Sequence, residues 1–177
     1  MKAVLISIKP EWCELIATGK KKIEIRKRRP KMIPPFKCYI YMTSGDASIP
    51  DGKGMFHHHS GGRCVIGEFV CDKIIPIKVF PNGTIQNYMF YNMEQSCVDY
   101  DDIVNYIGNG CDGYGWHISN VVIYDKLMLI NEFIKPCERD LLCEECSMYS
   151  ELAERCCSAK LRILRPPQSW CYVEEVT

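Results

Sequence analysis

The sequence contains no long apolar run. No stretch approaches the roughly 20 apolar residues that a membrane-spanning helix needs. The apolar start at residues 1–8 is too short for a signal-peptide core with its cleavage site. We therefore expect a cytoplasmic protein without a membrane partner.

The sequence also lacks an excess of charge of either sign. Its 177 residues carry 22 Lys and Arg against 22 Asp and Glu, so the formal net charge is zero. This balance argues against a protein that coats nucleic acid without specificity. With 47% hydrophobic and 25% charged residues the composition is that of a globular protein, and no internal repeat is visible. We expect one domain over residues 1–177, and a monomer.

The charges that are present are segregated along the chain. Eight cations lie between residues 20 and 31: Lys20, Lys21, Lys22, Arg26, Lys27, Arg28, Arg29 and Lys31. The charged residues in 137–157 are mostly acidic, six against two cations. Segregation of this kind gives one face a local field that attracts a phosphate or an anionic base edge. A solvated basic strand end is the alternative interpretation.

Hydrophobic patterns predict a strand-helix-strand opening. Val4–Ile8 is a β-branched apolar run, typical of a buried strand. Pro10 suits the first turn of a helix over 10–18, and Gly19 suits its end. Residues 22–27 then alternate between apolar and charged side chains, as in a strand. Further strands are expected at 36–42, 64–70, 74–80, 119–130, 161–164 and 170–173, with a helix at 100–107, a loop at 44–62 and a flexible glycine-rich approach at 108–115. This order predicts an α+β fold, a closed or nearly closed mixed β-barrel with a few short helices.

The turn between the first helix and the second strand carries the string G-x-K-x-x-E-x-R at residues 19–26. The string and its context resemble the signature of the ASCH domain family, relatives of the PUA domain. Residues 7–12 also look like the opening of many ASCH proteins, and residues 165–172 look like the ending of a bacterial and phage subgroup. The resemblance covers roughly residues 1–133 and implies a PUA-like mixed β-barrel.

The side chains of this string are suited to holding a nucleobase. The Glu24 carboxylate accepts hydrogen bonds from an exocyclic amine, such as that of cytosine or adenine, and the Arg26 guanidinium donates to carbonyl or phosphate oxygens. Lys21 adds a mobile cation at the turn, and Lys9 precedes the helix. We therefore expect RNA or a modified nucleoside to bind between Lys9, Lys21, Glu24 and Arg26. A simple ladder of charges along the strand is the alternative.

Glu68 interrupts an apolar run at 64–70. It shares strand parity with Ile66 and Val70, so we expect it to be buried, to belong to the ligand site, and to face Lys21 or Arg26.

Hydrolysis remains an alternative to binding alone. In ASCH relatives that hydrolyse acetylated cytidine, the catalytic groups implied by the resemblance are a lysine in the signature and a glutamate on a later strand, here Lys21 and Glu68. Those enzymes carry threonine where this chain has Glu24. A small amidohydrolase is therefore one alternative, and a phage or host interaction protein is another.

Aromatic residues in the second half of the chain are candidates for stacking on a base. Trp116 and His117 follow a glycine-rich stretch, and Trp170 lies near the end. Exposed aromatic side chains stack on unpaired bases, so we assign these three residues to the ligand site. Core packing is the alternative for each tryptophan.

Five of the twelve cysteines crowd into residues 137–157. Without a secretory signal, thiols or metal ligands are expected before disulfides. Cys143 and Cys146 form a C-x-x-C pair, and with Cys137 and Cys157 they supply four thiolates for a structural zinc ion. Cys156 in place of Cys157, or free thiols throughout, are the alternatives. We predict a Cys-rich insertion here, before the last strands, and no organic cofactor.

Overall fold

The structure is a computed structural model that describes residues 1–51, 54–86, 88, 92–137 and 161–176. Its elements in chain order are β1 (Lys2–Ile8), α1 (Pro10–Ala17), β2 (Ile23–Arg26), β3 (Phe36–Met42), β4 (Ala47–Pro50), β5 (Phe56–His59), β6 (Cys64–Lys78), the 3-10 helix η1 (Met93–Ser96), α2 (Tyr100–Ile107), β7 (Asp112–Met128), the 3-10 helix η2 (Ile130–Glu132) and β8 (Trp170–Glu174). The α+β class predicted from the sequence is confirmed.

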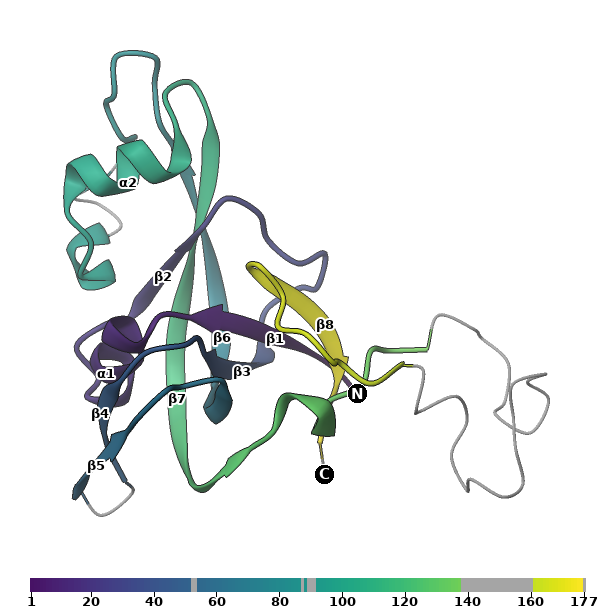
Figure 1. The fold of residues 1–177 in the computed structure, drawn as a ribbon. Helices are drawn as coiled ribbons and strands as arrows, with labels where there is room; N and C mark the ends of the chain where they lie inside the picture. The colour runs from purple at the N-terminus through teal and green to yellow at the C-terminus, as the bar shows by residue number, and fades with distance from the viewer. Residues whose placement is uncertain (52–53, 87, 89–91, 138–160, 177) are drawn as a thin grey trace.

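Six strands form one mixed sheet in the order β2-β7-β6-β3-β1-β8 (Figure 1). Strand β1 runs parallel to β3, and the other neighbouring pairs are antiparallel. Within the described residues β2 and β8 are edges of this sheet, so the predicted closed barrel is wrong. A side chain spans the remaining gap, because the Arg26 Nη2 of β2 donates to the Ser7 carbonyl oxygen of β1 at 2.6 Å.

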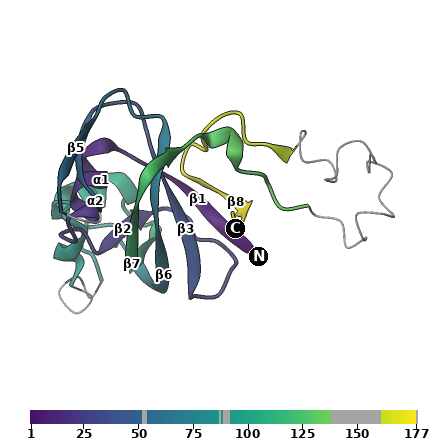
Figure 2. The ribbon, with the colours of Figure 1, turned by 90° about the horizontal axis from the view of Figure 1, so that it is seen from below.

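The two ends of the described chain lie side by side. Lys2 pairs with Glu174 where β1 and β8 run antiparallel, and Figures 1 and 2 show both termini at the same end of these strands. The predicted final strand at 170–173 is therefore confirmed. The other one, at 161–164, is reduced to a single bridge between Ile134 and Arg162.

Strands β6 and β7 are much longer than predicted. The expected strands at 64–70 and 74–80 merge into β6, and β7 begins at Asp112 instead of residue 119. Two of the glycines predicted to make a flexible approach, Gly113 and Gly115, lie inside β7, where they allow close packing. A Cβ at Gly113 would come within 2.6 Å of Ile107, and one at Gly115 within 2.9 Å of Ile23.

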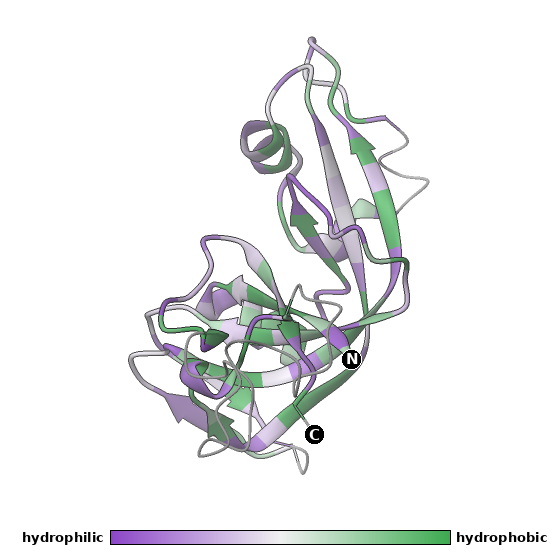
Figure 3. Cartoon of the chain, turned by 90° about the vertical axis from the view of Figure 1, so that its right-hand side faces the viewer, coloured by the Kyte–Doolittle hydropathy of each residue, from purple (hydrophilic) through white to green (hydrophobic). Residues whose placement is uncertain are grey.

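Helix α2 packs on the C-terminal end of β6 and the N-terminal end of β7 (Figures 1 and 3). Ile103 and Ile107 of α2 are buried against Ile75 and Ile77 of β6. A larger apolar cluster lies between the sheet, α1 and the β4–β5 hairpin, and a third lies around β1, β3 and β8. No helix in the described part of the chain is long and apolar enough to cross a membrane.

The β4–β5 hairpin occupies the segment predicted to be a loop. Its strands pair from Ala47 with His59 to Pro50 with Phe56. Ala47 and Ile49 are buried in the cluster beneath α1, and the Ser48 amide donates to the Glu14 carboxylate of that helix. Burial of two alternating small or apolar residues explains a strand in a segment whose glycine content favours a loop.

Candidate functional site

The turn from α1 to β2 directs Lys21 into the protein. Helix α1 ends at Ala17, and Gly19 follows at a φ of +71°, which glycine adopts without a steric penalty. The Lys21 amide then donates to the Leu15 carbonyl oxygen at 2.9 Å. The chain thus folds back on the helix end before it enters β2.

Three charged side chains meet at the start of β2. Glu24 lies between two cations, with Oε2 at 3.3 Å from Lys21 Nζ and Oε1 at 2.9 Å from Arg26 Nη2. Only 2% of Lys21, 6% of Glu24 and 8% of Arg26 is exposed. The solvated basic strand end considered from the sequence is therefore excluded for these three residues, which we call the charged triad.

The two cations of the charged triad are also held by groups from distant parts of the chain. Lys21 Nζ donates to the Ser96 carbonyl oxygen at the end of η1 and lies 4.7 Å from the centre of the Trp12 ring. Arg26 donates through Nη1 to Ser169 Oγ at 3.4 Å, whereas its buried Nε has no acceptor within the described residues. Two cations and one carboxylate leave one net positive charge.

The charged triad lines a cleft of about 520 Å³ between α1, β2 and α2. Trp12 and Tyr106 contribute aromatic surface, and Asp102 contributes a carboxylate from α2. Other lining residues are Ser7, Ile8, Lys9, Ile25, Thr43, Val98, Ile103, Gln168 and Ser169. The arrangement offers hydrogen-bond donors, acceptors and aromatic faces in one space, which is typical of a small-molecule site.

Glu68 does not face the charged triad, so its predicted partners were wrong. Its carboxylate pairs with Lys37 at 3.0 Å and accepts a hydrogen bond from the Tyr124 hydroxyl. The pairing of β6 with both neighbours shifts register around Gly67, where a Cβ would come within 2.2 Å of the Val122 carbonyl oxygen. These shifts break the simple alternation that placed Glu68 with Ile66.

The Glu68 carboxylate also affects the pKa of the Tyr124 hydroxyl. Burial raises the pKa of Tyr124, and the hydrogen bond and charge of Glu68 raise it further. Tyr124 therefore stays protonated as a donor to Glu68, which suits a structural contact.

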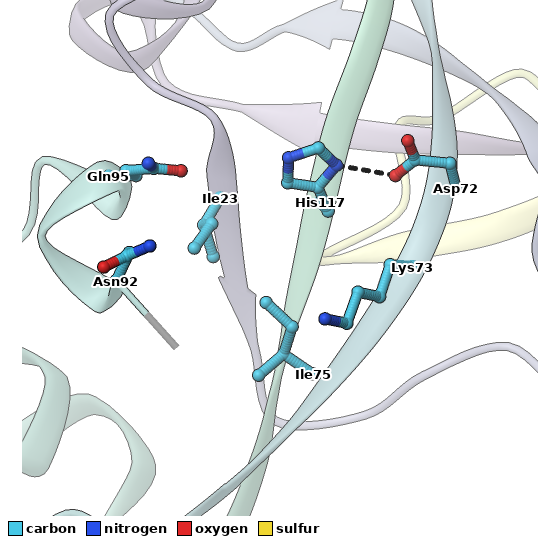
Figure 4. A pocket seen from close by; sticks show the side chains of 7 residues that line it. All are labelled: Ile23, Asp72, Lys73, Ile75, Asn92, Gln95 and His117. Atoms are coloured by element: carbon cyan, nitrogen blue, oxygen red, sulfur yellow. Dashed lines mark hydrogen bonds and ion pairs between the residues drawn. The ribbon is translucent and has the colours of Figure 1, made fainter. Parts of the chain in front are cut away.

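The predicted stacking residues do not line the cleft. Trp116 is fully buried in the core, with its ring centre 5.9 Å from that of Phe36 and 5.8 Å from that of Trp170. Trp170 is half-buried, follows the cleft residue Ser169, and donates from Nε1 to the Arg28 carbonyl oxygen at 3.3 Å. His117 lies in a separate pocket (Figure 4). Neighbouring strand positions face opposite sides of a sheet, which explains why Trp116 and His117 part.

Several cleft residues were not found from the sequence. Asp102, Tyr106 and Ser169 reach the cleft from segments more than 70 residues away from Lys21. No local pattern marked Asp102 or Tyr106 as ligand residues, and Ser169 was noted only as part of the ASCH-like ending at residues 165–172. Trp12 was not assigned to the ligand site. Its place in the ASCH-like opening at residues 7–12 was the available signal.

The predicted zinc ligands Cys143, Cys146 and Cys157 lie outside the described residues, as does most of the predicted Cys-rich insertion. Cys137 is described and exposed. Within the described part of the chain, no three histidine, cysteine or acidic residues are grouped so as to hold a metal ion.

The fold and this cleft define a known class of domain. A family model for the ASCH domain matches residues 6–121, so the chain belongs to the ASCH domain family. It is similar to the crystal structure of ASCH from Zymomonas mobilis, with a TM-score of 0.53 and 18% identity over 98% of this chain and 88% of that one.

Two structures of single-residue mutants of the Zymomonas mobilis protein give TM-scores of 0.54 and 0.55, with 18% and 19% identity. They cover 98% and 99% of this chain and 89% and 92% of theirs. No curated protein matches the chain significantly.

Proposed function

We propose that the protein binds a nucleobase-containing ligand, RNA or a modified nucleoside, in the cleft formed by the charged triad. The observation that carries this proposal is a net positive charge buried at the floor of an open pocket. Buried ion pairs are often no more stable than apolar residues of the same volume. Three buried charged groups on one short strand and its turn therefore favour a ligand role over a purely structural one.

The chemistry of the cleft supports a base rather than a simple anion. Trp12 and Tyr106 provide aromatic faces on which a base can stack. Glu24 and Asp102 are acceptors for exocyclic amines, whereas Arg26 is a donor for carbonyl or phosphate oxygens. The ligand thus needs a flat ring with both donors and acceptors on its edge.

The test is calorimetric titration with the four ribonucleosides, their monophosphates and a short single-stranded RNA. We expect at least one to bind, and Arg26→Lys to weaken it about tenfold, because the planar guanidinium gives two directed hydrogen bonds where an ammonium gives one. Lys37→Gln is the matched control, since Lys37 pairs with Glu68 away from the cleft. Absence of binding at millimolar concentration, or equal losses in both variants, would refute the proposal.

A second candidate is hydrolysis of an acylated cytidine. The 3.3 Å contact between Lys21 and Glu24 favours it, because an amine and a carboxylate at one site can share proton transfer. Glu24 would have to carry the proton in place of Glu68. Incubation with N4-acetylcytidine and chromatography for cytidine and acetate tests this function, and Glu24→Gln should abolish turnover. If wild-type protein forms no product, the hydrolase is excluded and the binding proposal stands.

A further inference from the structure

A second pocket, of about 580 Å³, lies over β2, β6 and β7 (Figure 4). Seven residues line it: Ile23, Asp72, Lys73, Ile75, Asn92, Gln95 and His117. None of them lines the cleft of the charged triad. The proposed function therefore makes no use of this pocket.

The strand register brings the lining residues of the sheet together. His117 of β7 pairs with Ile23 of β2 on one side and with Lys73 of β6 on the other. Two residues earlier on β7, Gly115 pairs with Ile75 and has no side chain. The result is a pocket floor on which His117 and Lys73 are accessible, whereas Ile23 and Ile75 are only 1% and 3% exposed.

An irregularity in β6 adds a carboxylate to this floor. The β6–β7 pairing shifts register between Cys71 and Lys73, which makes Asp72 an extra residue. Because of the shift, Asp72 and Lys73 are both exposed although they are neighbours in the strand. Bulges of this kind re-aim side chains and are frequent beside functional sites.

Asp72 fixes the orientation of His117. The two side chains are joined by a hydrogen bond of 2.6 Å between Nδ1 and Oδ1. A carboxylate only accepts, so Nδ1 of His117 is the donor, and in the neutral ring Nε2 is left as an acceptor. Figure 4 shows that the other edge of the imidazole faces the space toward Gln95.

The wall opposite His117 is η1. Gln95 of η1 and Asn92, the residue before it, extend toward His117 and Ile23 (Figure 4). A backbone hydrogen bond of 2.8 Å from the Lys22 amide to the Gln95 carbonyl oxygen ties this wall to the sheet. Within the described part of the chain, the side chains of Lys73, Asn92 and Gln95 make no hydrogen bond or ion pair, so they are available to a ligand.

We propose that this pocket binds a nucleoside monophosphate. The two carboxamides read the edge of the base, as Asn and Gln do for adenine. Nε2 of His117 accepts a hydrogen bond from a ribose hydroxyl, and the Lys73 ammonium pairs with the phosphate. A volume of 580 Å³ is within the range of ligand pockets that accept molecules of this size.

The experiment is titration of AMP into the full chain, followed by NMR of the histidine ring signals. The sequence has four histidines, and His117→Gln identifies the signal of His117. We expect AMP to shift this signal. Each of the variants Lys73→Ala, Asp72→Asn and Gln95→Ala should weaken the affinity for AMP about tenfold, because each removes a hydrogen bond or a charge contact. Adenosine lacks the phosphate and ribose 5-phosphate lacks the base, so both should bind more weakly than AMP.

Two variants separate this pocket from the cleft. Lys78→Ala removes an exposed lysine of β6 outside the pocket and should leave the AMP response of His117 unchanged. Arg26→Lys should weaken ligands of the cleft and leave that response in place. A His117 signal that does not move with millimolar AMP overturns the proposal. So does a response that Arg26→Lys removes and Lys73→Ala preserves, because AMP then acts from the cleft. The first outcome does not decide whether the cleft binds its own ligand.

Discussion

Glu24→Gln is the substitution that perturbs the charged triad most directly. The amide keeps the shape of the side chain and removes its charge. Lys21 and Arg26, which are 2% and 8% exposed, would then be buried together without an anion. Breaking a buried ion pair by removing one partner costs about 3–5 kcal/mol. In a chain of this length that cost corresponds to a fall in Tm of about 6–20 °C.

Thermal and urea unfolding followed by circular dichroism measure this effect. Glu68→Gln is the matched control, because the side chains of Glu68 and its partner Lys37 are 21% and 29% exposed. A partly solvated pair contributes about 0–1 kcal/mol, so this variant should melt close to the wild type. The contrast between the two glutamates separates loss of a buried charge from any general effect of glutamine.

A second substitution tests the cause of the loss. Lys21→Met in the Glu24→Gln background removes one of the two unpaired cations, so it should recover part of the lost stability. A double-mutant cycle should give a coupling of about 0.5–3 kcal/mol between these positions. If Glu24→Gln melts within about 2 °C of the wild type, the charged triad is solvated and the reasoning fails.

Three further predictions concern other parts of the molecule. Burial raises the pKa of the Cys71 thiol from 9.0 to about 12. The stability that the protonated thiol contributes is therefore complete below pH 9 and is lost as the pH rises toward 12. Cys71→Ala should weaken the pH dependence of Tm between these values, and an unchanged profile would contradict this prediction. Trp116→Ala should cost about 3–5 kcal/mol of stability, as for other large core aromatics, and a normal melting curve would show that Trp116 is not in the core. The zinc site expected from the cysteines at 137–157 predicts about one zinc per chain after chelator-free, reducing purification, and metal analysis that finds none would refute it.

Local signals predicted the part of the fold that holds the site. Pro10 and Gly19 marked the two ends of a helix predicted at residues 10–18, and α1 spans Pro10–Ala17. The alternation at 22–27 placed Glu24 and Arg26 on one face, where they form an ion pair. Both features depend on residues close in sequence, whose effects reach no further than one turn or one strand.

Long-range features could not be predicted in the same way. Alternation assumes a regular strand, so the register shifts around Gly67 gave Glu68 the wrong neighbours. Barrel closure depends on whether two edge strands pair, and here Arg26 bridges to β1 with its side chain instead. The position of Trp116 in the core likewise depends on β7. The glycines before Trp116 indicated a loop, so the sequence did not predict that this strand begins at residue 112.

The η1 segment has a consequence for how the two pockets respond to each other. Its Ser96 carbonyl oxygen holds Lys21 at the floor of the cleft, and the Gln95 side chain stands in the neighbouring pocket. A ligand that displaced this segment from one side would also move the group that it holds on the other side. Thermodynamic linkage then requires the two binding constants to change by the same factor, and a coupling of about 1 kcal/mol would make that factor about five. A short turn of 3-10 helix would in this way let the occupancy of one pocket set the affinity of the other.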